Sequence, residues 1–253
     1  MSAHARRSGG LRGAGARALR GARRRLFRLR GAAAGGQRHS YVGPAHLWLL
    51  KRRFQFEFLT SNGLRPESRL LDIGCGTLRG GIPLIEYLQP GHYVGVEARS
   101  EVLQEARREL AEAKLAGKRP LLINTADPSR VHLEAPVDFA WAFSVLFHMS
   151  DEIVDACLGM VARELADGGV FYANVGLAEQ TEQQGDWQGF PVISRPRAFY
   201  QSLAAGHGLD VADVGSLDAL GHPSEAGGRS LMLRFTRAPG ATAGARDAHS
   251  SSS

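Results

Sequence analysis

Two acidic residues flank a glycine-rich stretch at a spacing that suits nucleoside binding. The stretch Asp72-Ile73-Gly74-Cys75-Gly76-Thr77 follows an apolar segment, and its glycines let the backbone approach a ligand without Cβ collisions. Glu97 lies twenty-one residues after Gly76 at the end of the next apolar segment. A carboxylate at that place can accept hydrogen bonds from both hydroxyls of a ribose. The pattern therefore predicts a ligand that contains a nucleoside.

Asp72 discriminates between the nucleoside ligands. A dinucleotide site turns backbone N–H groups toward a pyrophosphate, which a carboxylate beside the loop would repel. S-adenosyl-L-methionine has no phosphate and carries a sulfonium and an ammonium group, which acids attract. Asp72 and Glu97 together favour this cofactor and disfavour a nicotinamide oxidoreductase.

Apolar runs alternate with helical periodicities from about residue 45 onward, and this alternation is typical of α/β proteins. We expect helices over 45–61, 82–88, 100–117, 150–165 and 196–205, and a polar loop over 176–192 that contains Trp187 and Phe190. Strands are expected over 69–73, 93–97, 121–124, 137–142, 170–175, 209–214 and 231–235. The predicted fold is a Rossmann-like, seven-stranded, mainly parallel, doubly wound sheet with flanking helices. Its ligands should bind at the carboxyl ends of the strands, beside the first strand.

Several segments resemble the motifs of class I S-adenosylmethionine-dependent methyltransferases, over roughly Gly43 to Arg237. LLDIGCGTLRGG is similar to the first motif of that family and YVGVEA to the second. PVDFAWAFSVLFHM resembles the fourth motif and LADGGVFYANV the fifth strand with its preceding turn. One departure is that Leu78 stands where the commonest first motif has a third glycine, with Gly80 and Gly81 after it. This departure implies a small bacterial subgroup with a DIGCGxLRGG motif.

The resemblance implies roles for individual residues. Ribose recognition falls on Glu97, and Asp127, after the third strand, is a partner for the adenine amino group or a turn-forming residue. Phe143 and Ser144 lie at the mouth of the site and are expected to contact cofactor or substrate. The expected cofactor-binding residues are Asp72, Gly74, Cys75, Gly76, Thr77, Glu97, Ala98, Asp127, Phe143 and Ser144.

His148 is the candidate catalytic residue because it follows the fourth strand by six residues. Methyl transfer from a sulfonium is an in-line displacement that needs a nucleophile held close to the methyl group. A general base is needed only for a hydroxyl or a charged amine. The alternative is that Phe147, His148 and Met149 form a packed turn before a helix that Ser150 caps.

The formal charge of +6 conceals two different parts of the chain. Eleven arginines and no acids lie in residues 1–40, which leaves 20 basic residues against 25 acidic ones in the rest. We expect residues 1–40 to be a disordered basic tail, 41–237 the methyltransferase domain and 238–253 a second disordered tail. The first tail is also compatible with an organellar transit segment or an over-extended start site.

The composition bounds the location of the protein. It has no run of eighteen apolar residues, no apolar region of a secretory signal, and two cysteines, Cys75 and Cys157, too few for a disulfide framework or metal cluster. We therefore expect a cytoplasmic enzyme with neither a membrane partner nor a metal.

The favoured function is methyl transfer to a small-molecule or glycan-type acceptor, at oxygen or nitrogen. One alternative is an RNA or protein methyltransferase that uses the basic tail, although Glu179, Glu182 and Asp186 in the polar loop argue against a nucleic-acid partner. Another is a protein that binds S-adenosylmethionine without transferring its methyl group.

Overall fold

The computed structural model describes residues 41, 43, 45–222 and 230–240. The predicted tail over 1–40 and nearly all of the one over 238–253 lie outside these residues, so both remain predictions. Among the described helices, none has the length and apolar character that crossing a membrane requires.

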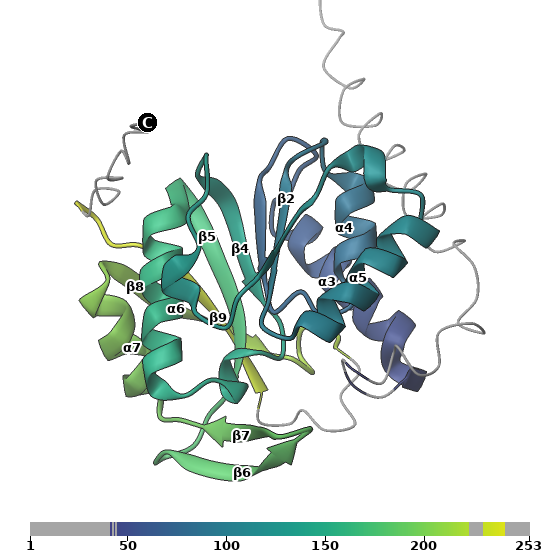
Figure 1. The fold of residues 1–253 in the computed structure, drawn as a ribbon. Coiled ribbons are helices and arrows are strands. Elements are labelled where there is room, and N and C mark those ends of the chain that lie inside the picture. Colours follow the sequence, from purple (N-terminus) through teal and green to yellow (C-terminus); the bar gives the residue numbers. More distant parts are fainter. Residues whose placement is uncertain (1–40, 42, 44, 223–229, 241–253) are drawn as a thin grey trace, which may run out of the picture. The chain divides into compact units, whose positions relative to one another are not determined.

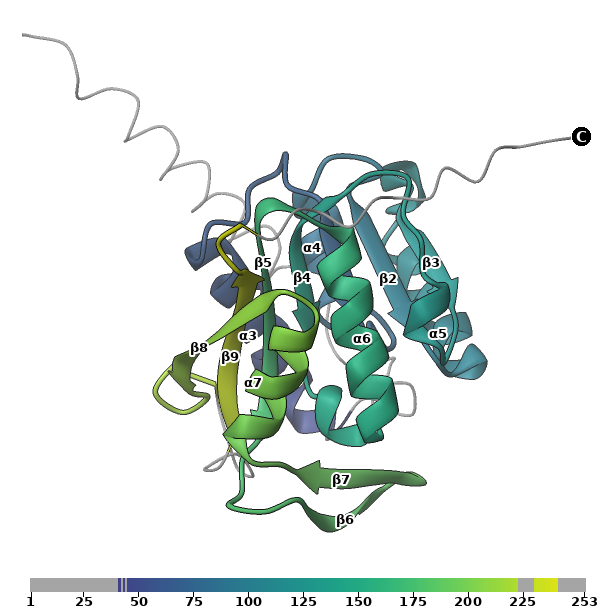
Figure 2. The ribbon, with the colours of Figure 1, turned by 90° about the vertical axis from the view of Figure 1, so that its left-hand side faces the viewer.

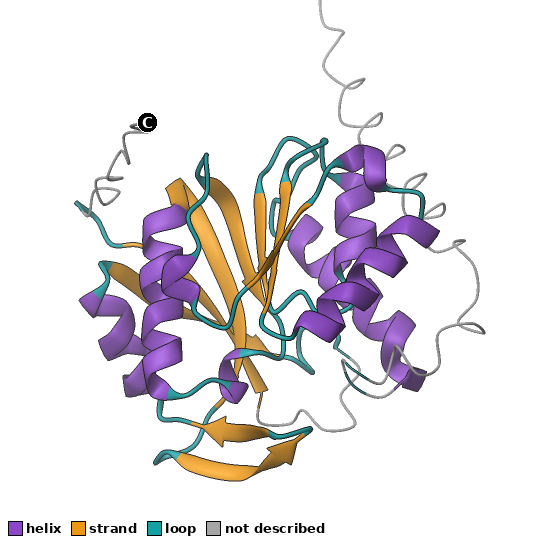
Figure 3. Ribbon diagram, in the orientation of Figure 1, coloured by secondary structure: helices purple, strands orange, loops and turns teal. Residues whose placement is uncertain are grey.

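The central sheet has the predicted Rossmann-like architecture (Figures 1 and 3). Its seven strands lie in the order β3-β2-β1-β4-β5-β9-β8. All neighbours are parallel except β9, which runs antiparallel to β5 and β8. The strands are β1 (Leu70–Ile73), β2 (Tyr93–Glu97), β3 (Leu121–Asn124), β4 (Val137–Ala142), β5 (Leu165–Gly176), β8 (Leu209–Ser216) and β9 (Ser230–Arg237).

Helices cover both faces of the sheet (Figure 1). One face carries α3 (Trp48–Ser61), α4 (Gly81–Tyr87) and α5 (Ser100–Glu112), and the other carries α6 (Asp151–Glu164) and α7 (Arg197–Gly206). The shorter 3-10 turns are η1 (Ala45–Leu47), η2 (Ala116–Lys118), η3 (Pro128–Arg130) and η4 (Leu146–His148). The sheet order reverses between β1 and β4, which is the place where α/β folds bind ligands.

The buried stripes of the helices explain why these segments pack as they do. Val154, Leu158 and Val161 recur at helical spacing along α6 and are fully buried against the sheet. Phe54 and Phe58 of α3 are also buried, and their rings pack at a centroid distance of 5.8 Å. Both rings therefore belong to the core.

Several boundaries differ from the sequence prediction, most of all at β5 and α5. Strand β5 begins at Leu165, five residues before the predicted start at residue 170. Helix α5 ends at Glu112 rather than near Gly117, because Lys114 takes a left-handed backbone and the chain turns before η2. Arg99 occupies the N-cap of that helix. Ser150 does occupy the N-cap of α6.

The segment predicted as a polar loop contains an antiparallel hairpin, so that prediction was wrong. Its strands are β6 (Glu182–Trp187) and β7 (Phe190–Ser194), and they form a separate two-stranded sheet. The turn residues Gln188 and Gly189 both have positive φ, 54° and 84°, as the tightest hairpin turns require. Two perpendicular views place the hairpin next to the carboxyl ends of the parallel strands, close to η4 (Figures 1 and 2).

Candidate active site

A cavity of about 470 Å³ lies at the carboxyl ends of β1, β2 and β4. Parallel pairing brings these ends together: Ile73 pairs with Val96 on one side and with Ala142 on the other. Of the residues predicted from the sequence, those that line the cavity are Asp72, Gly74, Cys75, Gly76, Glu97, Ala98, Phe143, Ser144 and His148. Thr77 and Asp127 do not line it.

The glycine loop turns sharply against the end of β2. The backbone N–H groups of Gly74 and Cys75 both donate to the Val96 carbonyl, at 2.8 and 3.0 Å. Gly74 and Gly76 have φ of +68° and +57°, a region that glycine adopts without steric cost. Leu78 shares this left-handed backbone, with φ of 61°, and its side chain is fully buried. Leu78, which replaces the third glycine of the common motif, therefore keeps the backbone conformation that favours glycine.

Replacing Gly74 by alanine should destabilise the fold. The added Cβ would lie 2.4 Å from one γ carbon of Val145, in addition to the strain of the positive φ. Gly168→Ala is the matched control, since φ there is +74° and nothing lies within 4 Å of the new Cβ. We expect Gly74→Ala to lower the free energy of unfolding by about 2 kcal/mol more than the control, measured by urea denaturation. If both variants lose the same free energy of unfolding, the side chain of Val145 moves aside without an energetic penalty.

Asp72 is a buried acid at the base of the cavity. Its carboxylate accepts a hydrogen bond of 2.6 Å from the hydroxyl of Tyr93. Burial raises the pKa of Asp72 to about 7, although that hydrogen bond and the charge of Arg79 oppose the shift. The site therefore holds a carboxyl that ionises near neutral pH and that a cationic ligand group would drive to its charged form.

Glu97 joins the glycine loop to the start of α5. Its Oε2 accepts from the backbone N–H of Gly76 at 3.1 Å. Its Oε1 accepts from the backbone N–H and the Nε of Arg99, at 3.0 and 3.2 Å. These bonds fix the carboxylate at the cavity wall. Oε2 accepts one of them and keeps a second lone pair for a ligand, whereas Oε1 already accepts two.

The two cysteines are not set up as nucleophiles. Both are buried, and burial raises the pKa of Cys75 well above its usual value and that of Cys157 to about 12. A thiol with so high a pKa is protonated at neutral pH and unreactive. Cys75 instead packs closely on Gly95, where an added Cβ would lie 2.9 Å from its sulfur.

Asp127 and Thr77 lie beside the cavity rather than on its wall. The Asp127 carboxylate caps η3 by accepting from the N–H and hydroxyl of Ser129, at 3.0 and 2.6 Å. Its neighbours Ala126 and Pro128 do line the cavity. Thr77 is fully buried, and its hydroxyl has no hydrogen-bond partner within the described part of the chain. Their predicted cofactor contacts remain predictions.

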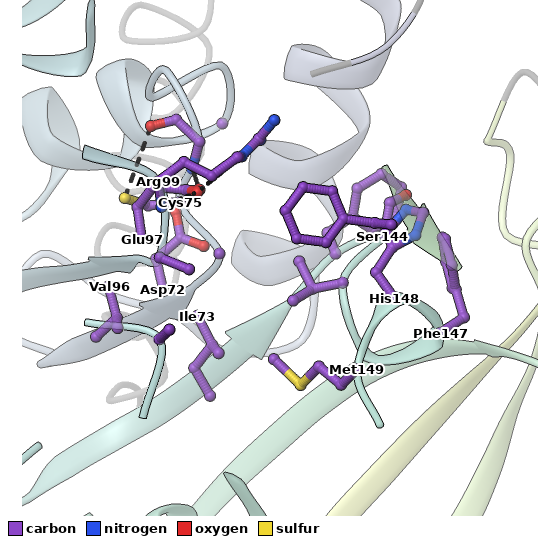
Figure 4. Close-up of a pocket in the computed structure, with 18 of the residues that line it drawn as sticks. Asp72, Ile73, Cys75, Val96, Glu97, Arg99, Ser144, Phe147, His148 and Met149 are labelled. Carbon is purple, nitrogen blue, oxygen red and sulfur yellow. Dashed lines mark hydrogen bonds and ion pairs between the residues drawn. The ribbon is translucent and has the colours of Figure 1, made fainter. Parts of the chain in front are cut away.

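His148 faces the same cavity from the opposite side (Figure 4). Its Nδ1 lies 2.9 Å from the carbonyl oxygen of Pro191 in β7. A carbonyl only accepts, so Nδ1 carries the proton and Nε2 of the neutral ring has a free lone pair. Burial is the main cause that lowers the pKa of His148, and the charge of Arg99 acts in the same direction. The ring is therefore neutral near pH 7 and able to accept a proton.

Two cations on the cavity wall were not singled out as a pair by the sequence. Lys51 projects from α3 and Arg79 from the glycine loop. Burial and the charge of Arg79 lower the pKa of Lys51 to about 8. Burial and the charge of Arg52 lower that of Arg79 to about 10. An anionic group bound between Lys51 and Arg79 would relieve this repulsion.

Arg195, at the end of β7, holds the turn that carries His148. Its fully buried guanidinium donates to the carboxylate of Asp151 at 2.8 Å and to the carbonyl of Met149 at 2.7 Å. A third, longer bond of 3.5 Å reaches the carbonyl of Leu146. These contacts span 44 or more residues, so local sequence gave no signal for them.

Comparisons with known proteins agree with this geometry. The family model of a methyltransferase domain matches residues 71–171, which contain both acids of the cavity and His148. No curated relative matches the chain in sequence.

Solved structures of low sequence identity share the fold. A glycopeptide N-methyltransferase, MtfA, in complex with S-adenosyl-L-homocysteine, is 16% identical, with a TM-score of 0.57 over 75% of this chain and 89% of that protein. Magnesium protoporphyrin IX methyltransferase of Synechocystis PCC 6803, with bound S-adenosylmethionine, is also 16% identical, with a TM-score of 0.58 over 82% and 93%.

A third structure is an S-adenosylmethionine-dependent methyltransferase from Clostridium acetobutylicum, 14% identical over 76% of this chain and 92% of that protein, with a TM-score of 0.57. The family match and the observed sheet order agree on one assignment. Both agree with the predicted class I S-adenosylmethionine-dependent methyltransferase and with S-adenosyl-L-methionine as its cofactor.

Proposed function

We propose that the protein methylates a small-molecule or glycan-type acceptor and that His148 is its general base. The observation that carries the proposal is the free Nε2 of His148 in the cavity that Asp72 and Glu97 also line. A cavity of about 470 Å³ has the size of a small-ligand site.

The residues present suit the cofactor. We assign the ribose hydroxyls to Glu97 and the ammonium group to Asp72, because acids attract hydrogen-bond donors and cations. We assign the carboxylate of the cofactor to Lys51 and Arg79, whose mutual repulsion it would relieve. When bound, S-adenosylmethionine supplies a methyl group on a positively charged sulfur, which keeps the electron pair of the carbon–sulfur bond as that bond breaks.

His148 accepts the proton of the acceptor. Its Nδ1–H bond to Pro191 fixes the tautomer, so Nε2 is the atom that takes the proton. On the neighbouring turn, the backbone N–H of Ser144 donates to the buried side chain of Asn174 at 2.6 Å, with φ of 62° at Ser144. This bond fixes the end of β4 and supports our assignment of Phe143 and Ser144 to cofactor or substrate contacts.

Methyl-labelled S-adenosylmethionine distinguishes the acceptor classes. The protein is incubated with it and with a cell extract divided into small molecules, protein and RNA. We expect label in the small-molecule fraction, and the same amount after residues 1–40 are deleted. Label in RNA or protein that requires those residues would overturn the proposal. Cofactor binding without label in any fraction would instead indicate a binding protein without transferase activity.

The affinity for S-adenosylhomocysteine should depend on pH through Asp72. The pKa of Asp72 is about 7 in the ligand-free protein, so its carboxyl is protonated below that pH. Binding of the ligand's ammonium group at low pH therefore requires that this carboxyl lose its proton. Calorimetry should show affinity that rises from about pH 5 to about pH 7 and then levels off. Asp72→Asn should remove this dependence, whereas exposed Asp210→Asn should retain it. A wild-type affinity that is flat over this range would refute the assignment.

The same shift sets the pH dependence of stability. The folded-state pKa of Asp72 lies above its unfolded value, so the free energy of unfolding of the ligand-free protein should fall as pH rises from about 4 to about 7. In Asp72→Asn, the free energy of unfolding measured by urea denaturation should depend less on pH over this range.

A further inference from the structure

The wall of the cavity around His148 is almost entirely apolar. The hairpin contributes Trp187, Phe190 and Val192, and η4 and its C-cap contribute Phe147 and Met149. The polar side chains on the cavity wall at this end are Arg99, Ser144 and His148. A ligand with many hydroxyl groups would lose hydrogen bonds to water here and find few replacements.

Aromatic rings surround the imidazole on several sides. His148 stacks on Trp187 with centroids 5.6 Å apart and an interplanar angle of 30°. Phe147 lies 4.5 Å from it at 59°, and Phe190 lies 6.4 Å away in an edge orientation. Rings so arranged favour a flat, apolar ligand that continues the stack.

Arg99 sets the charge that this end of the cavity accepts. Its guanidinium lies over the rings of Trp187 and Phe190, at 5.8 and 5.5 Å from their centroids. Its NH1 also approaches the side-chain oxygen of Gln188 at the tip of the hairpin, at 3.4 Å. An ammonium group could otherwise bind over the faces of Trp187 and Phe190. The guanidinium of Arg99 already lies there, and its positive charge repels a second cation.

The base strength of His148 limits the acceptor further. Burial lowers the pKa of its imidazole, which makes it a weak base. A phenol, with a pKa of about 10 like that of tyrosine, lies within reach of such a base during the transfer. An aliphatic hydroxyl, whose pKa lies nearer the value of about 16 for water, is the harder proton donor for this base.

We propose that the acceptor is a neutral or anionic phenol whose ring packs in the apolar wall that Trp187, Phe190 and Phe147 form around His148. This inference rests on the proposed function and narrows its acceptor class. The phenol proton passes to Nε2 of His148, the oxygen forms the new bond to the methyl carbon, and the products are an aryl methyl ether, S-adenosylhomocysteine and an imidazolium. Figure 4 shows His148 and Phe147 across the cavity from Glu97, the residue that we assign to the ribose.

Binding to the protein saturated with S-adenosylhomocysteine tests the proposal without turnover. The probes are methyl 4-hydroxybenzoate, cyclohexanol, methyl glucoside and benzylamine, measured by calorimetry. We expect the phenol to bind at least tenfold more tightly than the other three, and to be the one that is methylated when S-adenosylmethionine is present. Tighter binding or methylation of the glucoside or the amine would overturn the phenol assignment and leave the proposed small-molecule function intact.

Trp187→Leu and Phe190→Leu test the wall itself. Each should weaken phenol binding about tenfold, the loss expected for one aromatic contact, and leave the dissociation constant of S-adenosylhomocysteine unchanged. Gln184→Ala, exposed on the same hairpin, is the control and should change neither. Loss of S-adenosylhomocysteine affinity in the Trp187 and Phe190 variants, with phenol affinity retained, would place these rings at the cofactor and refute the subsite.

Discussion

Glu97→Ala should weaken the binding of S-adenosylhomocysteine about 100-fold. The change removes a carboxylate assigned to two ribose hydroxyls, and hydrogen bonds to a charged group contribute roughly 1.5–3 kcal/mol each. It also leaves the buried N–H of Gly76 without the oxygen that it reaches at 3.1 Å, which loosens the glycine loop. Isothermal titration calorimetry measures the dissociation constant directly.

The control for this variant is Glu101→Ala, which removes an exposed carboxylate in the first turn of α5. It should leave the affinity within about a factor of two, because exposed charges are screened by solvent. An unchanged affinity in Glu97→Ala would mean that the ribose assignment is wrong.

His148→Asn should lower kcat by a factor of about 100 to 10,000, the range for loss of a general base. The asparagine amide can still donate toward the Pro191 carbonyl but offers no basic nitrogen. The dissociation constant of S-adenosylhomocysteine should not change. Wild-type kcat should rise through a pKa below the usual value of histidine, because burial lowers that pKa, and should be flat at neutral pH.

Exposed His132→Asn is the matched control and should retain wild-type kcat. If His148→Asn keeps full activity and the same pH profile, the histidine serves only to pack the turn before α6.

The sheet could be predicted because its signals are local. Each strand from β1 to β5 contains an apolar run, and helices with buried stripes separate most of these strands. The glycines of the 74–76 loop and Glu97 could be recognised because strand ends and turns fix where such residues must lie. The expected S-adenosylmethionine cofactor agrees with the methyltransferase-domain match over residues 71–171.

The hairpin could not be predicted for a physical reason. All residues of β6 before Trp187 are exposed and polar or glycine, so the strand lacks the apolar alternation that marks a buried face. Its turn, Gln188-Gly189, is a weaker signal than the common Asn-Gly pair. What holds the hairpin is distant in sequence: Arg99 lies under its tip and Pro191 accepts from His148.

Long-range contacts also explain the residues that sequence reasoning did not assign to the site. Lys51 is one of several basic residues in α3, and only packing reveals that it faces Arg79. Arg195 carries no motif, yet its buried bonds to Asp151 and Met149 define the turn that presents His148.

The Glu97–Arg99 contact makes the two halves of the site thermodynamically dependent on each other. One carboxylate oxygen of Glu97 holds the guanidinium that lies over Trp187 and Phe190, while the same carboxylate is assigned to the ribose. A ligand that shifts this carboxylate also shifts the cation against the aromatic wall. Such linkage is reciprocal: whatever factor S-adenosylhomocysteine imposes on acceptor affinity, the acceptor must impose on S-adenosylhomocysteine.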